Sequence, residues 1–179
     1  MIEEILEYNK KFVANKEYKP FETSKFPEKK LAIVTCMDTR LIELLPAALG
    51  IKNGDAKIIK NAGGVISHPF GSAVRSLLIA IYDLGVQDVM IIGHSDCGVQ
   101  HMDSAAMLQT MRTRGVSSQV VDTMQYCGID FDLWLSGFES VEESVKRSVQ
   151  LLLEHPLIPD DIRIYGMVMD STTGELTQV

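Results

Sequence analysis

The segment VTCMDTRLIELLP, residues 34–46, places a thiol, a carboxylate and a guanidinium where an apolar run ends. Cys36, Asp38 and Arg40 stand two residues apart, so in an extended chain their side chains point to the same side. Taken alone, these three residues are better explained by a structural role. Arg40 would neutralise Asp38, and Cys36 would fill a small space in the core. A second segment downstream favours a functional site instead.

That second segment is GHSDCG, residues 93–98, in which His94 and Cys97 lie three residues apart between two glycines. The glycines let the chain turn sharply on either side. One imidazole and one thiolate at this spacing form a donor pair that zinc takes from a tight turn. An H-x-x-C pair alone is common by chance, so its meaning depends on whether the fold brings it to Cys36.

The apolar pattern predicts strands alternating with helices. Continuous apolar runs predict strands at 31–36, 55–64, 86–98 and 161–170, with a short return strand at 175–179. Helical periodicity predicts helices at 2–15, 41–50, 70–85, 99–115 and 140–156. The segment 116–137 has no clear period.

This alternation implies an α/β fold: a mostly parallel, twisted sheet of four strands plus a short antiparallel edge strand, with helices on both faces. There is no internal repeat, low-complexity tract or linker, so residues 1–179 are expected to form a single domain. The apolar stripe of helix 2–15 must pack on its own domain or on a partner subunit, and the sequence leaves both open.

The predicted fold brings the two motifs together. Cys36 ends the first strand, and His94 to Cys97 end the third. In a doubly wound sheet these strands are often neighbours, and ligands bind in the crevice where the strand order reverses. Three protein ligands with a fourth position available are typical of catalytic zinc. The alternative, two inert core cysteines and a satisfied loop histidine, leaves the convergence as coincidence.

Composition excludes several other classes of function. Seventeen basic against twenty-four acidic residues give a net charge of −7 with no basic cluster, so nucleic acid is not an expected partner. No apolar run approaches the roughly 20 residues of a membrane span. The charged N-terminal segment lacks the apolar centre of a signal peptide. We therefore expect a cytoplasmic protein whose three cysteines stay reduced.

Together the motifs resemble the β-class carbonic anhydrases, in which Cys-x-Asp-x-Arg is followed much later by His-x-x-Cys. This sequence has CMDTR (36–40) and HSDC (94–97), and NAGG (61–64) resembles the family's segment between them. The short chain and HSDCG are similar to the compact subgroup rather than to the plant-type enzymes. The resemblance covers roughly residues 1–115 and 140–179.

Two departures from the family pattern stand out. Lys60 precedes NAGG where arginine is expected, which would alter a salt bridge near the site. No glutamine occupies the place where plant-type members have one beside the substrate.

The resemblance implies one zinc per chain, with Cys36, His94 and Cys97 as metal ligands. It also implies reversible hydration of carbon dioxide to bicarbonate by attack of a zinc-bound hydroxide. Asp38 would act as a catalytic residue that accepts a hydrogen bond from this hydroxide, held in place by Arg40. If that pair broke, Asp38 would become a conditional fourth ligand and exclude water.

Other residues have weaker assignments. Asp96 would orient the turn between His94 and Cys97. His101 is a candidate proton relay or else a surface histidine. The resemblance further implies a homodimer or higher homo-oligomer, with helix 2–15 packed on the partner subunit.

Three rival functions stay open. A zinc hydrolase of carbon disulfide or carbonyl sulfide would use the same fold and the same nucleophile. A non-catalytic zinc or anion-binding protein would have Asp38 permanently capping the metal. A nucleotide-binding protein, with NAGG as its phosphate loop, is disfavoured because its glycines are too few and no acidic residue follows at the right distance.

Overall fold

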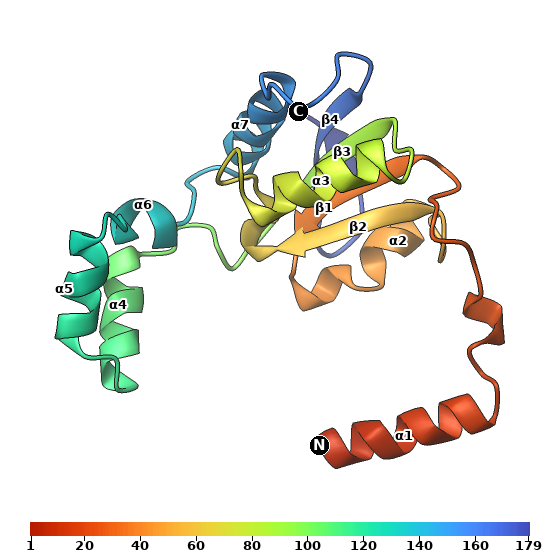
Figure 1. Ribbon diagram of the computed structural model, residues 1–179, viewed down its shortest axis with the longest axis horizontal. Helices are drawn as coiled ribbons and strands as arrows, with labels where there is room; N and C mark the ends of the chain where they lie inside the picture. Colours follow the sequence, from red (N-terminus) through yellow and green to blue (C-terminus); the bar gives the residue numbers. More distant parts are fainter.

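A five-stranded sheet organises the structure, a computed structural model that describes residues 1–179 (Figure 1). The strand order is β2-β1-β3-β4-β5. The strands are β1 (Leu31–Cys36), β2 (Ala56–Asn61), β3 (Asp88–His94), β4 (Arg163–Met169) and β5 (Leu176–Gln178). The first four run parallel and β5 pairs antiparallel with β4. The predicted α/β fold, with its antiparallel edge strand, is confirmed.

Three helices connect the parallel strands. Helix α2 (Leu44–Ala48) lies between β1 and β2, α3 (Ser72–Tyr82) between β2 and β3, and α7 (Val141–Leu153) between β3 and β4. Since such crossovers are right-handed and the strand order reverses at β1, α2 covers one face while α3 and α7 cover the other. Both faces are thereby shielded, which is why the central strands are continuous apolar runs.

Several predicted elements are shorter than the sequence pattern suggested. The helix predicted over 41–50 is divided into a 3-10 turn, Thr39–Leu41, and the short α2. The second and third strands end earlier than expected, at Asn61 and at His94. In both cases the residues that were expected to continue the strand form a tight turn instead. The turn brings the polar residues after the strand to the edge of the sheet.

The helix predicted over 99–115 begins later, as α4 (Ser104–Thr113), with the Asp103 carboxylate accepting from the backbone N–H of Ala106. The preceding residues pair instead with a distant segment. Gln100 and Phe138 form a parallel bridge, and the His101 N–H donates to the Phe138 carbonyl.

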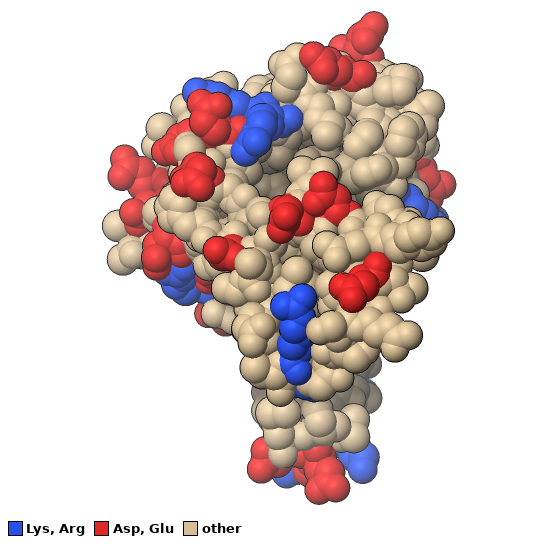
Figure 2. Space-filling view, turned by 90° about the vertical axis from the view of Figure 1, so that its left-hand side faces the viewer, with Lys and Arg blue, Asp and Glu red and all other residues tan.

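The segment without a clear period, 116–137, is largely helical. It contains α5 (Ser118–Tyr126) and α6 (Phe131–Leu135), which with α4 form a helical lobe, residues 104–135, that projects from the sheet (Figure 1). The core of the lobe is small: Leu108, Val121 and Phe131. Figure 2 shows the molecule from the side of the helical lobe. On this face the charged side chains lie in small scattered groups, and there is no broad basic surface.

Helix α1 (Ile2–Ala14) lies away from the sheet and is followed by a 3-10 turn, Lys19–Phe21 (Figure 1). None of its residues is buried, and the apolar side chains of Ile2, Ile5 and Leu6 are more than half exposed. The predicted helix is confirmed, and most of its apolar side is exposed, apart from Phe12, which lies against Phe21. No helix of the structure combines the length and apolar character needed to cross a membrane.

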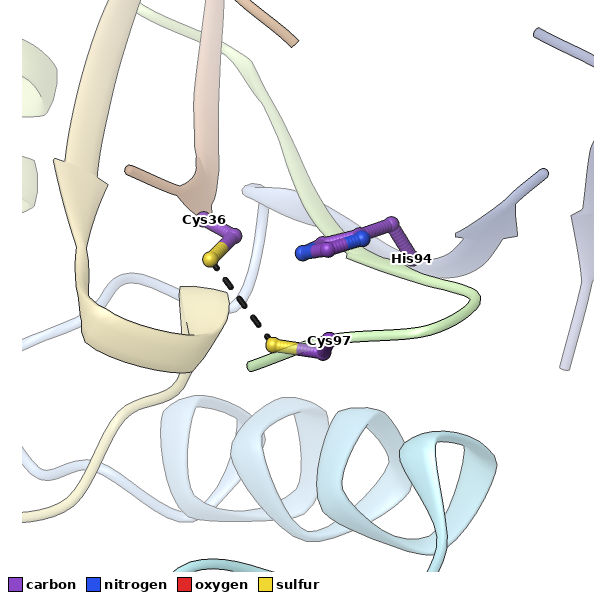
Figure 3. Close-up of side chains that lie close together, drawn as sticks. All are labelled: Cys36, His94 and Cys97. Carbon is purple, nitrogen blue, oxygen red and sulfur yellow. Dashed lines mark hydrogen bonds between the residues drawn. The ribbon is translucent and has the colours of Figure 1, made fainter. Parts of the chain in front are cut away.

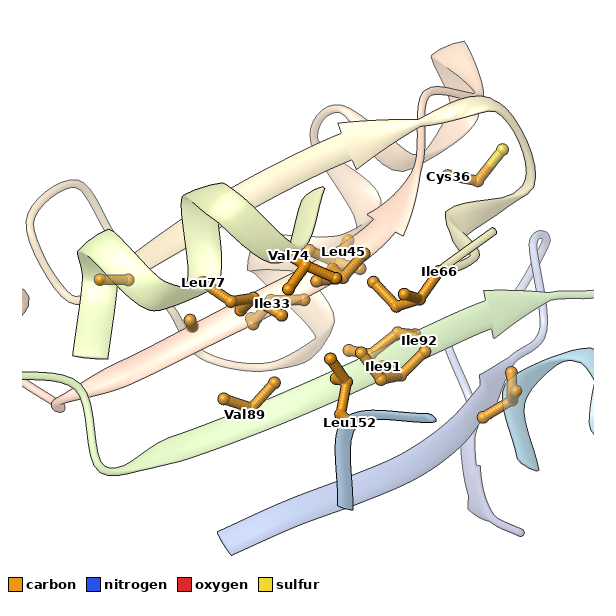
Figure 4. Close-up of a cluster of buried hydrophobic side chains, with 14 of the residues drawn as sticks. Ile33, Cys36, Leu45, Ile66, Val74, Leu77, Val89, Ile91, Ile92 and Leu152 are labelled. Carbon is orange, nitrogen blue, oxygen red and sulfur yellow. The ribbon is translucent and has the colours of Figure 1, made fainter. Parts of the chain in front are cut away.

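The main core lies on β1 and β3, where Ile33, Val34, Ile91 and Ile92 have no exposed surface (Figure 4). The turn after β2 packs directly against the ends of these strands. Its Gly64 has φ +65°, and a Cβ atom built there would lie 2.7 Å from the backbone nitrogen of Cys36. The NAGG segment is therefore a close backbone contact beneath the end of β1.

We predict that Gly64→Ala destabilises the fold more than Gly85→Ala. Both glycines have left-handed φ, so both substitutions lose about 1–2 kcal/mol of stability. Gly85 has open space around it, whereas at Gly64 the new methyl meets backbone atoms and costs a further ~1–3 kcal/mol. Urea unfolding of the two variants measures the difference. Equal losses would show that the turn can move away from β1.

Candidate metal centre

Cys36, His94 and Cys97 converge at the carboxyl edge of the sheet (Figure 3). One donor atom from each lies within 4.8 Å of the others, and the two sulfur atoms are 3.8 Å apart. The relative exposures are 3% for Cys36, 0% for His94 and 6% for Cys97. The structure thus brings together the three residues that the sequence singled out as metal ligands.

Parallel pairing explains this convergence. Cys36 is the last residue of β1 and His94 the last of β3, and these strands are adjacent and in register from Leu31↔Asp88 onward. Cys97 comes from the turn after β3. That turn is anchored on β4, because the Ser95 N–H donates to the Met169 carbonyl.

The imidazole of His94 has one satisfied and one unsatisfied nitrogen. Nδ1 lies 2.9 Å from the Ser95 carbonyl, which can only accept, so Nδ1 carries the proton and Nε2 presents a lone pair. Nε2 is buried and has no hydrogen-bond partner. An unsatisfied buried polar atom costs about 1–3 kcal/mol. A metal ion is the partner that this atom lacks, and two sulfurs with one nitrogen match the donors preferred by zinc.

The environment of Cys36 favours the thiolate that a metal requires. Burial raises the pKa of the Cys36 thiol, but the nearby His94 side chain lowers it. Backbone N–H groups of Asp38 and Gly63 also point at the sulfur, and together these effects bring the pKa of Cys36 to about 7. For Cys97, burial dominates and raises the pKa. Cys36 is therefore the first of the two thiols to ionise.

Asp38 and Arg40 form a two-point ion pair beside the three donors. Arg40 donates from Nε to Asp38 Oδ1 at 3.0 Å and from Nη2 to Oδ2 at 2.9 Å. These bonds hold the pKa of the Asp38 carboxyl well below its usual range, so it is ionised. Asp38 Oδ2 lies 3.9 Å from the unsatisfied Nε2 of His94. A fixed anionic acceptor thus stands next to the place where a metal would bind.

The other residues named from the sequence are placed differently. His101 is exposed and pairs with Glu139, with 3.0 Å between His101 Nδ1 and Glu139 Oε2. Its role as a proton relay stays a prediction. Lys60 makes no ion pair: its Nζ donates to the Leu41 carbonyl at 3.2 Å, and burial lowers its pKa. Cys127 is exposed.

Sequence reasoning missed two contributors. The first is the backbone N–H of Gly63, which acts on Cys36; the paired glycines of NAGG were the signal that backbone approaches the site closely. The second is the reach of Arg40 to Asp96, with Nη1 donating to Oδ2 at 2.8 Å. No sequence spacing indicates that contact, because it joins turns that follow different strands.

Comparison with known proteins identifies the family. The carbonic anhydrase family model matches residues 31–176. "Putative carbonic anhydrase YtiB" of Bacillus subtilis is 49% identical and the match covers 98% of this chain and 94% of that protein. A carbon disulfide hydrolase of Acidithiobacillus thiooxidans is 30% identical, with 83% and 76% covered.

Solved structures agree with the sequence matches. The β-carbonic anhydrase isoform I of Trichomonas vaginalis superposes with a TM-score of 0.89 at 35% identity, covering 99% of this chain and 96% of that one. The carbonic anhydrase of Streptococcus mutans gives 0.74 at 34% identity, with 96% of both chains covered. The chain therefore belongs to the β-carbonic anhydrase family, a family of zinc-dependent lyases.

Proposed function

We propose that this protein reversibly hydrates carbon dioxide to bicarbonate with one zinc ion per chain. The observation that carries the proposal is the unpartnered, buried Nε2 of His94, which lies close to two cysteine sulfurs and to the ionised Asp38. Cys36 and Cys97 would hold the zinc as thiolates and His94 would hold it as a neutral imidazole. When bound, zinc supplies a Lewis acid that lets a water molecule ionise near neutral pH.

Asp38 would orient the nucleophile. Since its pKa lies far below neutrality, it can only accept a hydrogen bond, and an accepting carboxylate fixes the direction in which the attacking oxygen presents its lone pair. Arg40 would keep Asp38 in that position through its two bonds. We infer these roles of Asp38 and Arg40 from the ion pair that joins them and from the short distance between Asp38 and His94.

A second candidate keeps the site and changes the substrate. Relatives named carbon disulfide hydrolase share about 30% identity with this chain, and the same nucleophile can attack carbon disulfide or carbonyl sulfide. A third candidate is a non-catalytic protein whose Asp38 caps the metal. Both oxygens of Asp38 are occupied by Arg40 in this structure, which favours an open site.

Assays of one zinc-loaded preparation against carbon dioxide, carbon disulfide and carbonyl sulfide separate these candidates. We expect carbon dioxide hydration to be the dominant activity. Turnover of the sulfur compounds alone would favour the second candidate. A zinc-loaded protein that is inert toward all three compounds throughout the neutral pH range would favour the capped protein.

We predict that the purified protein binds one zinc per chain and that Cys36→Ser, His94→Ala and Cys97→Ser each lose it. Each substitution removes one of the three donors, and the remaining two do not form a complete site. Metal analysis after dialysis gives the stoichiometry. Cys127→Ser is the matched control, because this thiol is exposed and remote from the cluster. Full zinc content in Cys97→Ser would refute the assignment.

Asp38→Ala is expected to keep its zinc and to lose on the order of 100-fold or more in carbon dioxide hydration, since only the positioning of the nucleophile is removed. Arg40→Ala should also be slow, for another reason: the freed carboxylate would move onto the metal. X-ray absorption should show an exchangeable ligand in the first variant and a protein carboxylate in the second. The same coordination in both would contradict these roles.

We further propose that the protein is a homo-oligomer of at least two chains, with α1 packed on the partner subunit. The apolar side of α1 is exposed, and burying such a stripe stabilises association. Light scattering should report a dimer or larger species. Leu6→Asp should weaken it, whereas Lys10→Gln, a change to a polar side chain of the same helix, should not. A monomer at micromolar concentration would contradict the proposal.

A further inference from the structure

The guanidinium of Arg40 joins two acids from different parts of the chain. Besides its two bonds to Asp38, it donates from Nη1 to Asp96 Oδ2 at 2.8 Å and from Nη2 to the Asp96 carbonyl at 2.7 Å. Four of the five N–H groups of the guanidinium are thereby used.

These contacts connect the segments that follow β1 and β3, the two strands that end in Cys36 and His94. Arg40 follows Cys36 after β1, and Asp96 lies between His94 and Cys97 after β3. The backbone at Asp96 is left-handed, with φ +53°, a conformation that aspartate tolerates better than most other residues. Asp96 therefore offers both its carboxylate and its main-chain oxygen to the same guanidinium.

Asp38 depends on Arg40 for its position. Arg40 is the only hydrogen-bond partner of the Asp38 carboxylate, through its side chain and its backbone N–H. With Oδ2 lying 3.9 Å from His94 Nε2, a small movement of the Asp38 side chain would bring a carboxylate oxygen to the place of the metal. The Arg40 side chain is 40% exposed, and a single ion pair with such exposure holds its partner weakly.

We propose that Asp96 is a positioning residue: it fixes the guanidinium of Arg40 and so keeps Asp38 off the metal. This inference rests on the proposed function, because it assigns Asp96 to the open state of that zinc site. Asp96 acts through Arg40 and touches neither donor atoms nor substrate. Its carboxylate is 86% exposed, so the effect comes from restraint of Arg40 and not from burial of a charge.

Asp96→Gly is the informative variant. Glycine keeps the left-handed backbone and the carbonyl that accepts from Nη2, and removes only the carboxylate. Without it, Asp38 should spend more time on the metal and compete with other ligands. Two readouts follow this competition: kcat/KM for carbon dioxide and the affinity of azide for the cobalt-substituted site, measured from its visible spectrum. Both should fall by roughly two- to fivefold, the range for exposed ion pairs, while metal content stays complete.

A double-mutant cycle with Arg40→Ala separates positioning from a general effect. In the Arg40→Ala background, Asp96→Gly should change neither readout further, because its only route of action is gone. Asp96→Asn should recover part of the loss, since an amide oxygen still accepts from Nη1. Asp122→Asn, on the exposed side of α5, is the matched control for removing one negative charge and should behave as wild type.

Three results would overturn the inference: wild-type azide affinity in Asp96→Gly, the same loss persisting in the Arg40→Ala background, or loss of metal from Asp96→Gly. The last would show that Asp96 only maintains the turn. The azide measurement does not require turnover. If the wild-type protein fails to hydrate carbon dioxide, the proposed function fails while the role of Asp96 is still decided by binding.

Discussion

Parallel pairing of β1 with β3 is the constraint on which the rest of the structure depends. Because the two strands run in the same direction and in register, Cys36 and His94 reach the same edge of the sheet at their carboxyl ends. The strand order reverses at β1, so the connections leave toward opposite faces and space is left between them. The turns that directly follow the two strands carry Asp38, Arg40 and Cys97, so these residues lie at the same edge of the sheet.

Burial of three polar donors at this edge is unfavourable in the protein alone. His94 Nε2 lacks a partner, and burial raises the pKa of Cys97. Metal binding would supply the missing interactions, so metal affinity and fold stability are coupled at this place. The close approach of Gly64 to β1 belongs to the same arrangement, because it lets the N–H of Gly63 reach the Cys36 sulfur.

The strands and the convergence of the two motifs were predictable because they depend on local patterns: continuous apolar runs, each followed by polar residues. Helices α5 and α6 of the helical lobe were not predictable in this way. The core of the lobe has only three buried apolar residues, while Tyr126, Leu133 and Trp134 are largely exposed, so no helical period stands out in segment 116–137. The bond between Arg40 and Asp96 was missed for a different reason. It depends on how two turns face each other, and residue spacing within either turn contains no information about that.

If the proposed function is correct, the position of Asp38 has to satisfy two opposed demands. A carboxylate that orients a nucleophile has to lie near the metal, and a carboxylate that lies near a metal tends to bind it. The structure meets both demands through geometry, because both Asp38 oxygens are engaged by one guanidinium. That guanidinium is also bound to Asp96, in the turn that carries Cys97. The proposed metal ligands and the restraint on Asp38 thus come from the same two strand ends, so a change in how β1 and β3 meet would alter both the candidate metal site and the position of Asp38.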